Sequence, residues 1–509
     1  MPTNTRSSNK RIAKNTVMLY TRMVIIMLVS LYTSRVILNS LGVVDYGVYN
    51  VVTGFVLAFG FLNSAMNASV QRFLTVEFKE NNSVKLNNVF NLSVLVHLIL
   101  AIIVVTATEA IGLYFVKYKL VIPPERLSAA IWIFHFSVIT LFFSIMNVPY
   151  RALIVTHEDM GTFAVISLFE AFAKLLIAIV IGHVIWDKLI VYGLLLALVA
   201  VIIQSFYMLN CRTRYKKEVI FRPIWDIVLF KEMTVFAGWN LFGVFAGIAY
   251  NQGVNIVMNL FGGPVVNAAR AIAFQVSGAA NQLVTNFQMA VNPPIMKSYV
   301  AREDTTTSLI CTSSKFSNIL LLIVAVPLII EMPYILQIWL KTVPEHTVVL
   351  ARLALIDALV CSFAGPLHTL FQATGDIKKY QIIISGILLL NLPFSYLFLK
   401  LGMGYEVTVI IAILLSFAAL ISRLFLIKQY LNLDVPYFMI RVFLPCFAVG
   451  VISSLCAWGV TRLMPVSIIR LIIVFFVAVI SIFASAYPLA LDSNEKLILR
   501  SFIDKIRKR

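Results

Sequence analysis

The sequence has few charged residues for its length. Only 13% of its 509 residues are Asp, Glu, Lys or Arg, whereas 60% are hydrophobic and the mean hydropathy is +0.92. A soluble protein of this length does not carry so much apolar surface, because a polar exterior has to cover its core. The composition therefore excludes a soluble globular fold and predicts an all-α integral membrane protein.

Cysteine is scarce as well, and the motifs of several enzyme classes are missing. The cysteines have no zinc-type spacing, and we expect them in membrane spans or on the cytoplasmic side, so no disulfide framework is indicated. The sequence contains no Gly-rich phosphate loop of the Walker type, which argues against direct use of ATP. We predict no metal site and no cofactor. The five cysteines are Cys211, Cys311, Cys361, Cys446 and Cys456.

Long hydrophobic runs are abundant. About 20 apolar residues at 1.5 Å each cross the hydrocarbon core, so runs of this length predict transmembrane helices. The first run is too long for the hydrophobic region of a signal peptide, and we expect no cleavage after it. The sequence contains fourteen such runs, at 16–38, 45–68, 89–113, 127–148, 161–183, 187–209, 233–260, 266–290, 315–339, 348–371, 381–399, 405–427, 438–460 and 468–490.

The positive charges are distributed unevenly between the two sides of these spans. The formal net charge is +18, from 41 Lys and Arg against 23 Asp and Glu. With the N-terminus in the cytoplasm, cytoplasmic segments hold 25 of these cations, the opposite side 6 and the spans 10. This is the positive-inside bias that sets membrane orientation. It predicts that both termini are cytoplasmic, which the even number of spans allows. Membrane lipids, and no nucleic acid, are the expected partners of the basic segments.

The chain repeats itself at an offset of about 220 residues. Residues 39–42 match 259–262, residues 70–72 match 291–293, and residues 156–159 match 374–376. Three matches in the same order predict duplication of a six-helix unit, as in many transporters. We therefore predict an N-terminal six-helix bundle at 1–209, a cytoplasmic linker at 210–232, a C-terminal six-helix bundle at 233–430, and two extra helices with a basic cytoplasmic tail at 431–509. The loops predicted on the outer side are short, and this argues against a membrane glycosyltransferase.

Ionisable residues inside the spans are candidates for a transport site, because charge is costly in a bilayer. Arg22 and Arg270 are the best candidates for binding a phosphate or diphosphate, since a guanidinium is always charged and can contact two oxygens. Arg35 and Arg352 lie nearer the outer ends, where snorkelling to the interface is the alternative. Arg22 and Arg35 are about 220° apart around a straight helix. They would face one cavity only if that helix bent.

Two further charged pairs lie inside predicted spans. Glu170 and Lys174 are four residues apart on one helix face, which predicts an ion pair buried in the bundle; alternatively, an anionic substrate competes with Glu170 for Lys174. Asp357 and His368 lie eleven residues apart on one helical stripe. An acid and a histidine on one stripe are candidates for coupling transport to a proton or sodium gradient.

The seventh and eighth predicted spans are rich in amides. Asn251, Asn255 and Asn259 recur every four residues, and Gln282 lies in the next span. Amides donate and accept hydrogen bonds, as recognition of sugar hydroxyls requires, but they are also common between packed membrane helices. So many amides in adjacent spans favour a hydrated cavity, and we expect Asn251, Asn255 and Gln282 to be among the residues that bind the substrate there.

A motif near the N-terminus resembles a known family. Arg35, Leu41-Gly42, Tyr46-Gly47 and Tyr49 fit the signature of bacterial polysaccharide exporters, and the segment 151–160 resembles the family's loop after its fourth helix. These are the O-antigen and lipopolysaccharide-type flippases of the multidrug/oligosaccharidyl-lipid/polysaccharide (MATE-like) superfamily. The resemblance implies two six-helix bundles around a central cavity whose cationic residues bind the diphosphate of the substrate. Arg22 and Arg270 match those cations by location, not by a motif residue.

The predicted function is therefore translocation of an undecaprenyl-diphosphate-linked oligosaccharide across the bacterial inner membrane by alternating access, without covalent chemistry. The substrate would be an O-antigen or other surface polysaccharide repeat unit, and polysaccharide polymerase machinery is a possible partner. A drug or cation antiporter of the same superfamily is the first alternative. A membrane glycosyltransferase is the second.

Overall fold

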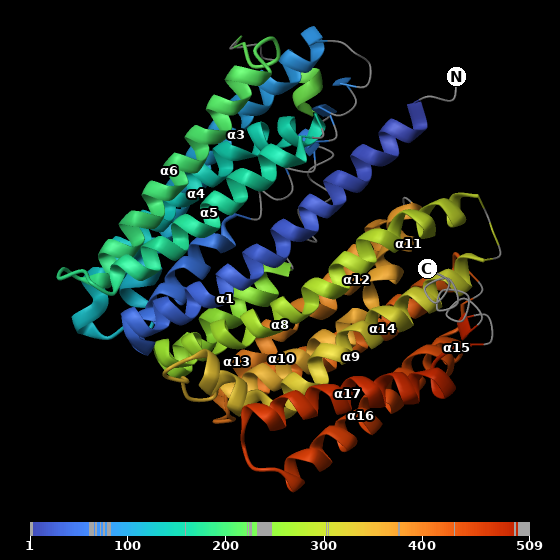
Figure 1. The fold of residues 1–509 in the computed structure, drawn as a ribbon. Coiled ribbons are helices and arrows are strands. Elements are labelled where there is room, and N and C mark those ends of the chain that lie inside the picture. The colour runs from blue at the N-terminus through green and yellow to red at the C-terminus, as the bar shows by residue number, and fades with distance from the viewer. Residues whose placement is uncertain are drawn as a thin grey trace. The chain divides into compact units, whose positions relative to one another are not determined.

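The computed structural model consists of helices joined by short connections (Figure 1). It describes residues 4–60, 66, 69–71, 73–74, 77–78, 83–157, 159–220, 222, 226–231, 247–301, 303, 305–374, 377–431, 433–492 and 495–496. Parts of the spans predicted at 45–68 and 233–260, and the basic tail 497–509, lie outside these residues. The described helices are α1 (Asn4–Ala58), α3 (Ser83–Tyr118), η1 (Pro124–Arg126), α4 (Leu127–Thr156), α5 (Met160–Ile181), α6 (Lys188–Arg214), η2 (Ala249–Gly253), α8 (Val254–Val300), α9 (Thr306–Trp339), α10 (Thr347–Ser362), α11 (Ala364–Thr374), α12 (Ile377–Leu389), α13 (Asn391–Lys400), α14 (Val407–Ile427), α15 (Val435–Phe438), η3 (Met439–Phe443), α16 (Leu444–Leu463) and α17 (Ile468–Leu489).

Most of these helices can cross a membrane. Within the described residues, eleven helices are long and apolar enough, and α10 with α11, bent by 41°, makes a twelfth crossing if the pair counts as one. Two of the eleven, α1 and α8, each contain a glycine with non-helical backbone angles. Counting each of these as two crossings gives the fourteen segments predicted from the sequence. The prediction of an all-α, multi-pass membrane protein is confirmed.

The two breaks have the same backbone geometry and a repeat-length separation. Gly42 has φ 82° and ψ 169°, and Gly263 has φ 64° and ψ −166°. A positive φ of this kind suits glycine because a Cβ would clash with the backbone. The spans predicted at 16–38 and 45–68, and those at 233–260 and 266–290, leave connections at 39–44 and 261–265, and these connections are the breaks inside otherwise helical segments. The sequence match paired Gly42 with Gly262, whereas the structure places the equivalent break one residue later.

By contacts between residues, the chain divides into two compact units. The first comprises Met1–Ala268 with Leu340–Pro344, and the second comprises Ala269–Trp339 with Glu345–Arg509. Their boundary falls within α8. The division predicted at residues 210–232 rests on the sequence repeat and stays a prediction.

In the first unit, α4 packs between α3 and α6, and α5 packs against α1 and α6. A core of aliphatic and aromatic side chains from α1, α3, α4 and α6 fills this bundle. The segment after α6 is bound back onto the bundle. The amide of Asn87 donates to the carbonyls of Glu218 and Ile220, and His157 contacts the carboxylate of Glu218 at 2.6 Å.

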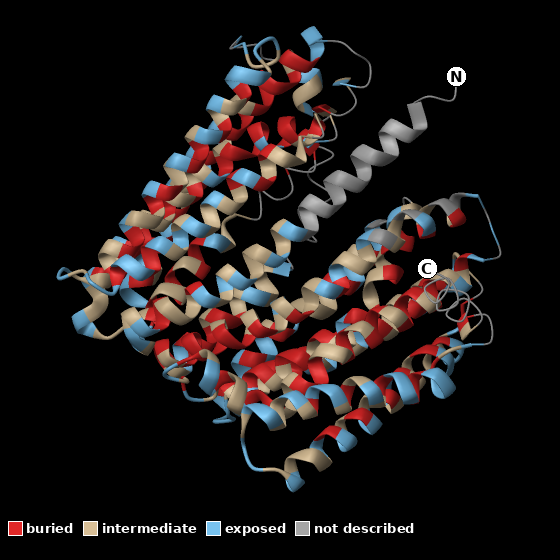
Figure 2. Cartoon of the chain, viewed as in Figure 1, coloured by how far each residue is buried: buried red, intermediate tan, exposed pale blue. Residues whose placement is uncertain are grey.

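In the second unit, α9 contacts α10, α16 and α17, and α14 contacts α10 and α12. Buried side chains of α9, α16 and α17 form one core with those of α11 and α14. Figure 2 shows the outward faces of α16 and α17 as largely exposed, as expected for helices that meet lipid. The pair is therefore an integral part of the second unit.

Candidate functional site

Helix α5 carries a polar stripe. Three polar residues, Ser167, Glu170 and Lys174, fall together with Phe163 within a sector of about 60° at 100° per residue. The opposite sector is apolar and exposed, as expected for a face in contact with lipid. The polar stripe therefore points away from the lipid-facing side of the helix. The exposed residues of the opposite sector are Val165 (65%), Phe169 (44%), Phe172 (51%) and Leu176 (62%).

Two arginines from different helices meet at the first residue of this stripe. The guanidinium carbon of Arg22, on α1, lies 4.5 Å from the centroid of the Phe163 ring, and that of Arg151, on α4, lies 5.4 Å from it. The two carbons cannot be further apart than the sum of these distances, about 10 Å. An aromatic ring holds a guanidinium without neutralising it. The arrangement therefore gathers two positive charges at one place.

The guanidinium groups of Arg22 and Arg151 form few hydrogen bonds with the described residues. Arg22 Nη1 donates to Ser167 Oγ over 3.2 Å, while its Nε is buried and has no hydrogen-bond partner in the described part of the chain. Among the described residues, neither Arg22 nor Arg151 forms an ion pair with a carboxylate. The buried Tyr207 of α6 lies beside Ser167 and both arginines. An anion is the partner that this site lacks.

Glu170 and Lys174 form the ion pair predicted from their spacing, with 2.6 Å between Lys174 Nζ and Glu170 Oε1. The side chains are 39% and 46% exposed, so the pair is more accessible than the buried pair expected from the sequence. Their position on the polar stripe directs both away from the apolar face of α5. They lie one to two helical turns beyond Ser167.

Arg35 is separate from this site. The segment of α1 that carries Arg22 and Arg35 is helical, and the break at Gly42 lies beyond both. The two side chains therefore leave the helix in different directions, as the sequence predicted for a straight helix. Arg35 is partly buried near the Gly42 break.

In the second unit, Arg270 is 6% exposed, and its guanidinium carbon lies 4.1 Å from the centroid of the Phe274 ring. Gln282, three turns further along α8, is partly buried. The structure thus gives Arg270 the same aromatic support that Phe163 gives Arg22.

The asparagines of the predicted cavity are divided between two environments. Asn259 and Asn267 are fully buried, Asn255 is 9% exposed, and their amides bond to one another over 2.8–2.9 Å. Asn259 also accepts a hydrogen bond from the backbone N–H of Val121 over 2.8 Å. This cluster spans the break at Gly263. Asn251, in contrast, is exposed on the π-helical turn η2, and its amide donates to the carbonyl of Gly247 over 3.0 Å.

Asp357 and His368 do not share one straight helix. Asp357 lies on α10 and His368 on α11, on either side of the 41° bend. Ser416 donates to Asp357 Oδ1 over 2.7 Å, whereas His368 contacts the Tyr380 hydroxyl over 3.1 Å. Each therefore has its own partners. Within the described residues, no group of three or more His, Cys, Asp or Glu side chains has a geometry suited to a metal ion.

The motif that resembles polysaccharide exporters has a structural explanation. Gly42 supplies the break in α1, and a Cβ on Gly47 would overlap the backbone carbonyl of Pro264. Tyr46 is 6% exposed, and Tyr49 packs edge-on against Tyr192 with 4.9 Å between ring centroids. These residues shape the first unit and do not contact Arg22.

The helix that carries the polar stripe begins at Asp159. Its carboxylate accepts a hydrogen bond from the backbone N–H of Thr162 and pairs with Arg214 over 2.6 Å. Burial raises the pKa of Asp159, but these hydrogen bonds and the Arg214 charge outweigh it, so the pKa lies below its ordinary value. Burial and the adjacent Asp159 carboxylate raise the pKa of Tyr215 to about 12.

Arg151 is the site residue that sequence reasoning missed. It was considered only as part of a family-like segment, because nothing in the sequence places it beside Arg22, 129 positions earlier. The helical period does align Phe163 with Ser167, Glu170 and Lys174. A search for polar stripes on otherwise apolar helices would have found that alignment, but not the arginines from α1 and α4.

Comparison with known proteins identifies the fold. No protein-family model matches the sequence, and no curated protein matches it. Among solved structures, lipid II flippase MurJ in an inward closed conformation matches with a TM-score of 0.71 and 11% identity, over 96% of this chain and 100% of that one. An inward-facing multidrug resistance MATE family transporter of the MOP superfamily matches with a TM-score of 0.67 and 14% identity, over 82% and 97%. A MOP superfamily transporter from Pyrococcus furiosus matches with a TM-score of 0.60 and 13% identity, over 82% and 95%. The chain therefore has the fold of this superfamily.

Proposed function

We propose that this protein is a flippase that moves an undecaprenyl-diphosphate-linked oligosaccharide, an O-antigen or similar polysaccharide repeat unit, across the bacterial inner membrane by alternating access. The observation that supports it is the pair of guanidinium groups, Arg22 and Arg151, held on Phe163 without a carboxylate partner in the described part of the chain. Both termini are cytoplasmic in this proposal.

The chemistry of the site fits a diphosphate. Guanidinium groups bind phosphate oxygens through pairs of charge-assisted hydrogen bonds, and aromatic support positions them in advance. Arg22 lies within the first predicted span and is half-buried, and an unpaired cation there is costly unless its charge has a use. The buried Nε of Arg22, which lacks a partner, is one donor available to such an anion.

The rest of the polar stripe gives the substrate a path along α5. From Phe163 to Lys174 the stripe covers eleven residues, about 16 Å at 1.5 Å per residue. An anion that leaves the arginines next meets Lys174, where it competes with Glu170. In the second unit, Arg270 is the proposed cationic contact, and Asn251 and Gln282 are proposed contacts for sugar hydroxyls.

The structural neighbours are consistent with a lipid substrate. One of them is a flippase for lipid II, and it aligns with almost the whole of this chain, whereas the MATE transporters align with a smaller share. The additional share is similar in length to the segment that carries α16 and α17.

The decisive experiment replaces the two arginines. We expect Arg22→Gln and Arg151→Gln each to reduce surface glycan about tenfold, the effect of losing one charge-assisted hydrogen bond, and the double variant to reduce it further. Surface glycan is measured by gel and lectin staining in cells whose own copy of the gene is deleted. Membrane levels of each variant are measured alongside.

Arg212→Gln is the matched control, because this exposed arginine lies near the same end of the first unit and does not contact Phe163. Full-length lipid-linked product should accumulate on the cytoplasmic side in the double variant, which also distinguishes a flippase from a glycosyltransferase. Unchanged surface glycan in the double variant at normal membrane level would contradict the proposal.

A drug or cation antiporter is the second candidate. Asp357 on α10 is an intramembrane carboxylate that accepts a hydrogen bond from Ser416, and carboxylates bind cations and protons. If this alternative holds, cells lacking the gene accumulate more ethidium, and Asp357→Asn does not restore export. If the flippase proposal holds, ethidium accumulation does not depend on the gene.

A further inference from the structure

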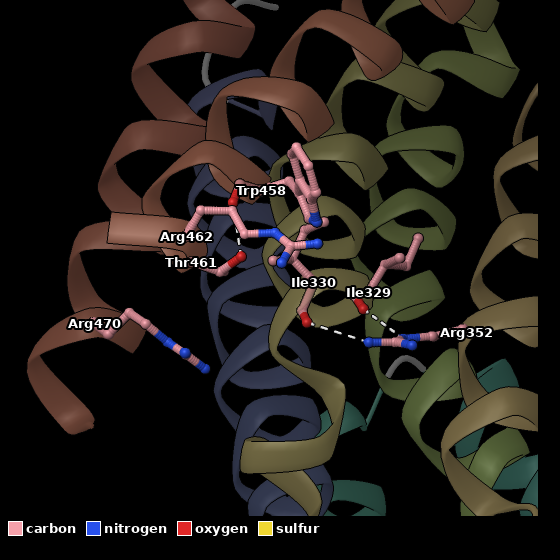
Figure 3. Close-up of a pocket in the computed structure, with 7 residues that line it drawn as sticks. All are labelled: Ile329, Ile330, Arg352, Trp458, Thr461, Arg462 and Arg470. Atoms are coloured by element: carbon pink, nitrogen blue, oxygen red, sulfur yellow. Dashed lines mark hydrogen bonds between the residues drawn. The ribbon is translucent and has the colours of Figure 1, made fainter. Parts of the chain in front are cut away.

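The second unit contains a pocket that the proposed function does not use. Its volume is about 530 Å³. Figure 3 shows its side chains entering from α9, α10, α16 and α17, all within one unit. The lining residues are Ile329, Ile330, Arg352, Trp458, Thr461, Arg462 and Arg470.

Three guanidinium groups converge on this pocket, but only one has a carboxylate partner. Arg470 Nη2 lies 2.7 Å from Glu331 Oε2, and the Glu331 side chain is 1% exposed. Arg352 donates to the backbone carbonyls of Ile329 and Ile330 over 2.8 and 3.4 Å. Within the described residues, neither Arg352 nor Arg462 has an ion pair. Two positive charges in the pocket therefore lack a counter-charge.

The donors of these arginines are only partly used. Arg462 has its guanidinium carbon 4.7 Å from the centroid of the Trp458 ring, and its side chain makes no hydrogen bond to any described residue. The Nε of Arg470 is buried without a hydrogen-bond partner in the same part of the chain. The Glu331 carboxylate holds Arg470, two backbone carbonyls hold Arg352, and the Trp458 ring supports Arg462. The pocket thus offers several N–H groups to one anion.

The location of these cations is unusual for a membrane protein. Of the 41 Lys and Arg, the sequence predicts only 6 on the outer side, and Arg462 is one of them, while Arg470 is the third residue of the span that follows. The positive-inside bias disfavours cations there. Their concentration in one pocket is therefore better explained by a ligand than by topology.

The mouth of the pocket adjoins apolar surface. Trp458 is 48% exposed, and tryptophan is enriched where a protein meets the lipid headgroups. Several residues of α16, α17 and the connection between them are apolar and at least half exposed, as expected for a surface covered by acyl chains. They are Leu455 (61%), Leu463 (84%), Val466 (60%), Ile468 (58%), Ile469 (62%) and Ile472 (50%).

We propose that this pocket binds the phosphate of a membrane phospholipid, whose acyl chains lie on the exposed faces of α16 and α17. Arg352 and Arg462 contact the phosphate oxygens, and Arg470, fixed by Glu331, completes the positive floor. Inorganic phosphate has the same charge chemistry, but it would gain nothing from the adjoining apolar surface. The site is independent of the transported substrate, because it lies at the outer end of four helices of the second unit.

Native mass spectrometry of the full-length protein in detergent tests this proposal. The delipidated protein is titrated with phosphatidylglycerol, with diacylglycerol, which lacks the phosphate, and with inorganic phosphate. We expect one tightly retained phosphatidylglycerol, no retained diacylglycerol, and no displacement of the lipid by millimolar phosphate. The double variant Arg352→Gln/Arg462→Gln should weaken retention by at least about tenfold, since it removes two charged donors.

Lys400→Gln is the control, because Lys400 is an exposed cation at the same end of the second unit and does not line the pocket. If the double variant does not fold, Arg462→Gln alone carries the test, since the Arg462 side chain has no hydrogen bond or ion pair with the described residues. Equal retention of phosphatidylglycerol by wild type and variants would overturn the site. Binding of inorganic phosphate as tight as that of the lipid would overturn the assignment to a phospholipid.

Discussion

Two cationic sites, one in each unit, hold positive charge in opposite ways. In the second unit, Lys315 is 1% exposed, and its Nζ lies 2.9 Å from Asp492 and 2.8 Å from Glu495. In the first unit, Arg22 and Arg151 lie against an aromatic ring and form no ion pair with a carboxylate of the described residues. The charge of Lys315 is neutralised by two carboxylates, whereas Arg22 and Arg151 keep their charge.

The difference separates an anchoring charge from a binding charge. Lys315 attaches the segment that follows α17 to α9, and a third hydrogen bond, to the carbonyl of Ala490 over 3.2 Å, completes its coordination. Nothing remains for a ligand to contact. The arginines of the first unit have spare donors and a support that leaves their charge intact. Lys315 is the more buried cation, yet its charge is used up by its partners, whereas the half-buried Arg22 and the exposed Arg151 keep theirs.

The largest effect on stability is expected at the anchoring charge. Lys315→Met should destabilise the protein by about 3–5 kcal/mol, because it leaves Glu495, 6% exposed, as an unpaired buried carboxylate. Thermal unfolding in detergent measures the change. Lys400→Met is the control, and Lys315→Met/Glu495→Gln should recover part of the loss. If Lys315→Met unfolds at the wild-type temperature, the pair does not anchor the segment.

A smaller, pH-dependent effect is expected at Asp159, which pairs with a half-exposed arginine. Asp159→Asn keeps an N-cap oxygen for α5 but removes the charge, and should cost less than about 1 kcal/mol at pH 7. Because the folded-state pKa of Asp159 lies below its ordinary value, the charged carboxylate stabilises the fold above pH 3.8. This contribution disappears as the pH falls through the lower, folded-state pKa.

Unfolding of wild type and Asp159→Asn across the acid range measures this dependence. The difference between the two proteins should be constant near neutrality and shrink below about pH 4. A difference that grows as the pH falls would contradict the assignment of a lowered pKa.

The smallest effect on stability is expected at the binding charges. Arg22→Gln and Arg151→Gln should each change the free energy of unfolding by no more than about 0.5 kcal/mol, since neither removes an ion pair. Thermal unfolding of the same preparations used for the glycan assay checks this. A loss comparable to that of Lys315→Met would show that these arginines serve the fold and would remove the distinction between the two units.

The sequence predicted the helices better than it predicted their partners. Hydropathy located the spans because each must satisfy its backbone hydrogen bonds internally and bury about 20 apolar residues. The Glu170–Lys174 pair followed from helical spacing alone. The breaks at Gly42 and Gly263 were taken for loops, because glycine content does not reveal whether the helix resumes immediately.

Contacts between helices could not be predicted from a single sequence. Nothing local places Arg151 beside Arg22, or joins Arg352 with two arginines more than 100 positions later. The Asp357–His368 stripe assumed a straight helix, and the bend between α10 and α11 separates the two residues. The sequence indicated Arg22, Arg352, Asp357 and His368 as unusual, but not Arg151, Arg462 or Arg470. The neighbours of all of them depend on packing among helices that are distant in sequence.

The amide cluster at Gly263 has a consequence for how this protein can change over generations. Asn255, Asn259 and Asn267 satisfy one another, and Asn259 also holds the backbone of Val121. Replacing one of them leaves buried polar groups of the others without hydrogen-bond partners. Exchanging all three for apolar residues of similar shape leaves far fewer buried polar groups without partners. Single substitutions at these three positions are therefore expected to be strongly destabilising. Simultaneous substitution of all three is the change that evolution can accept.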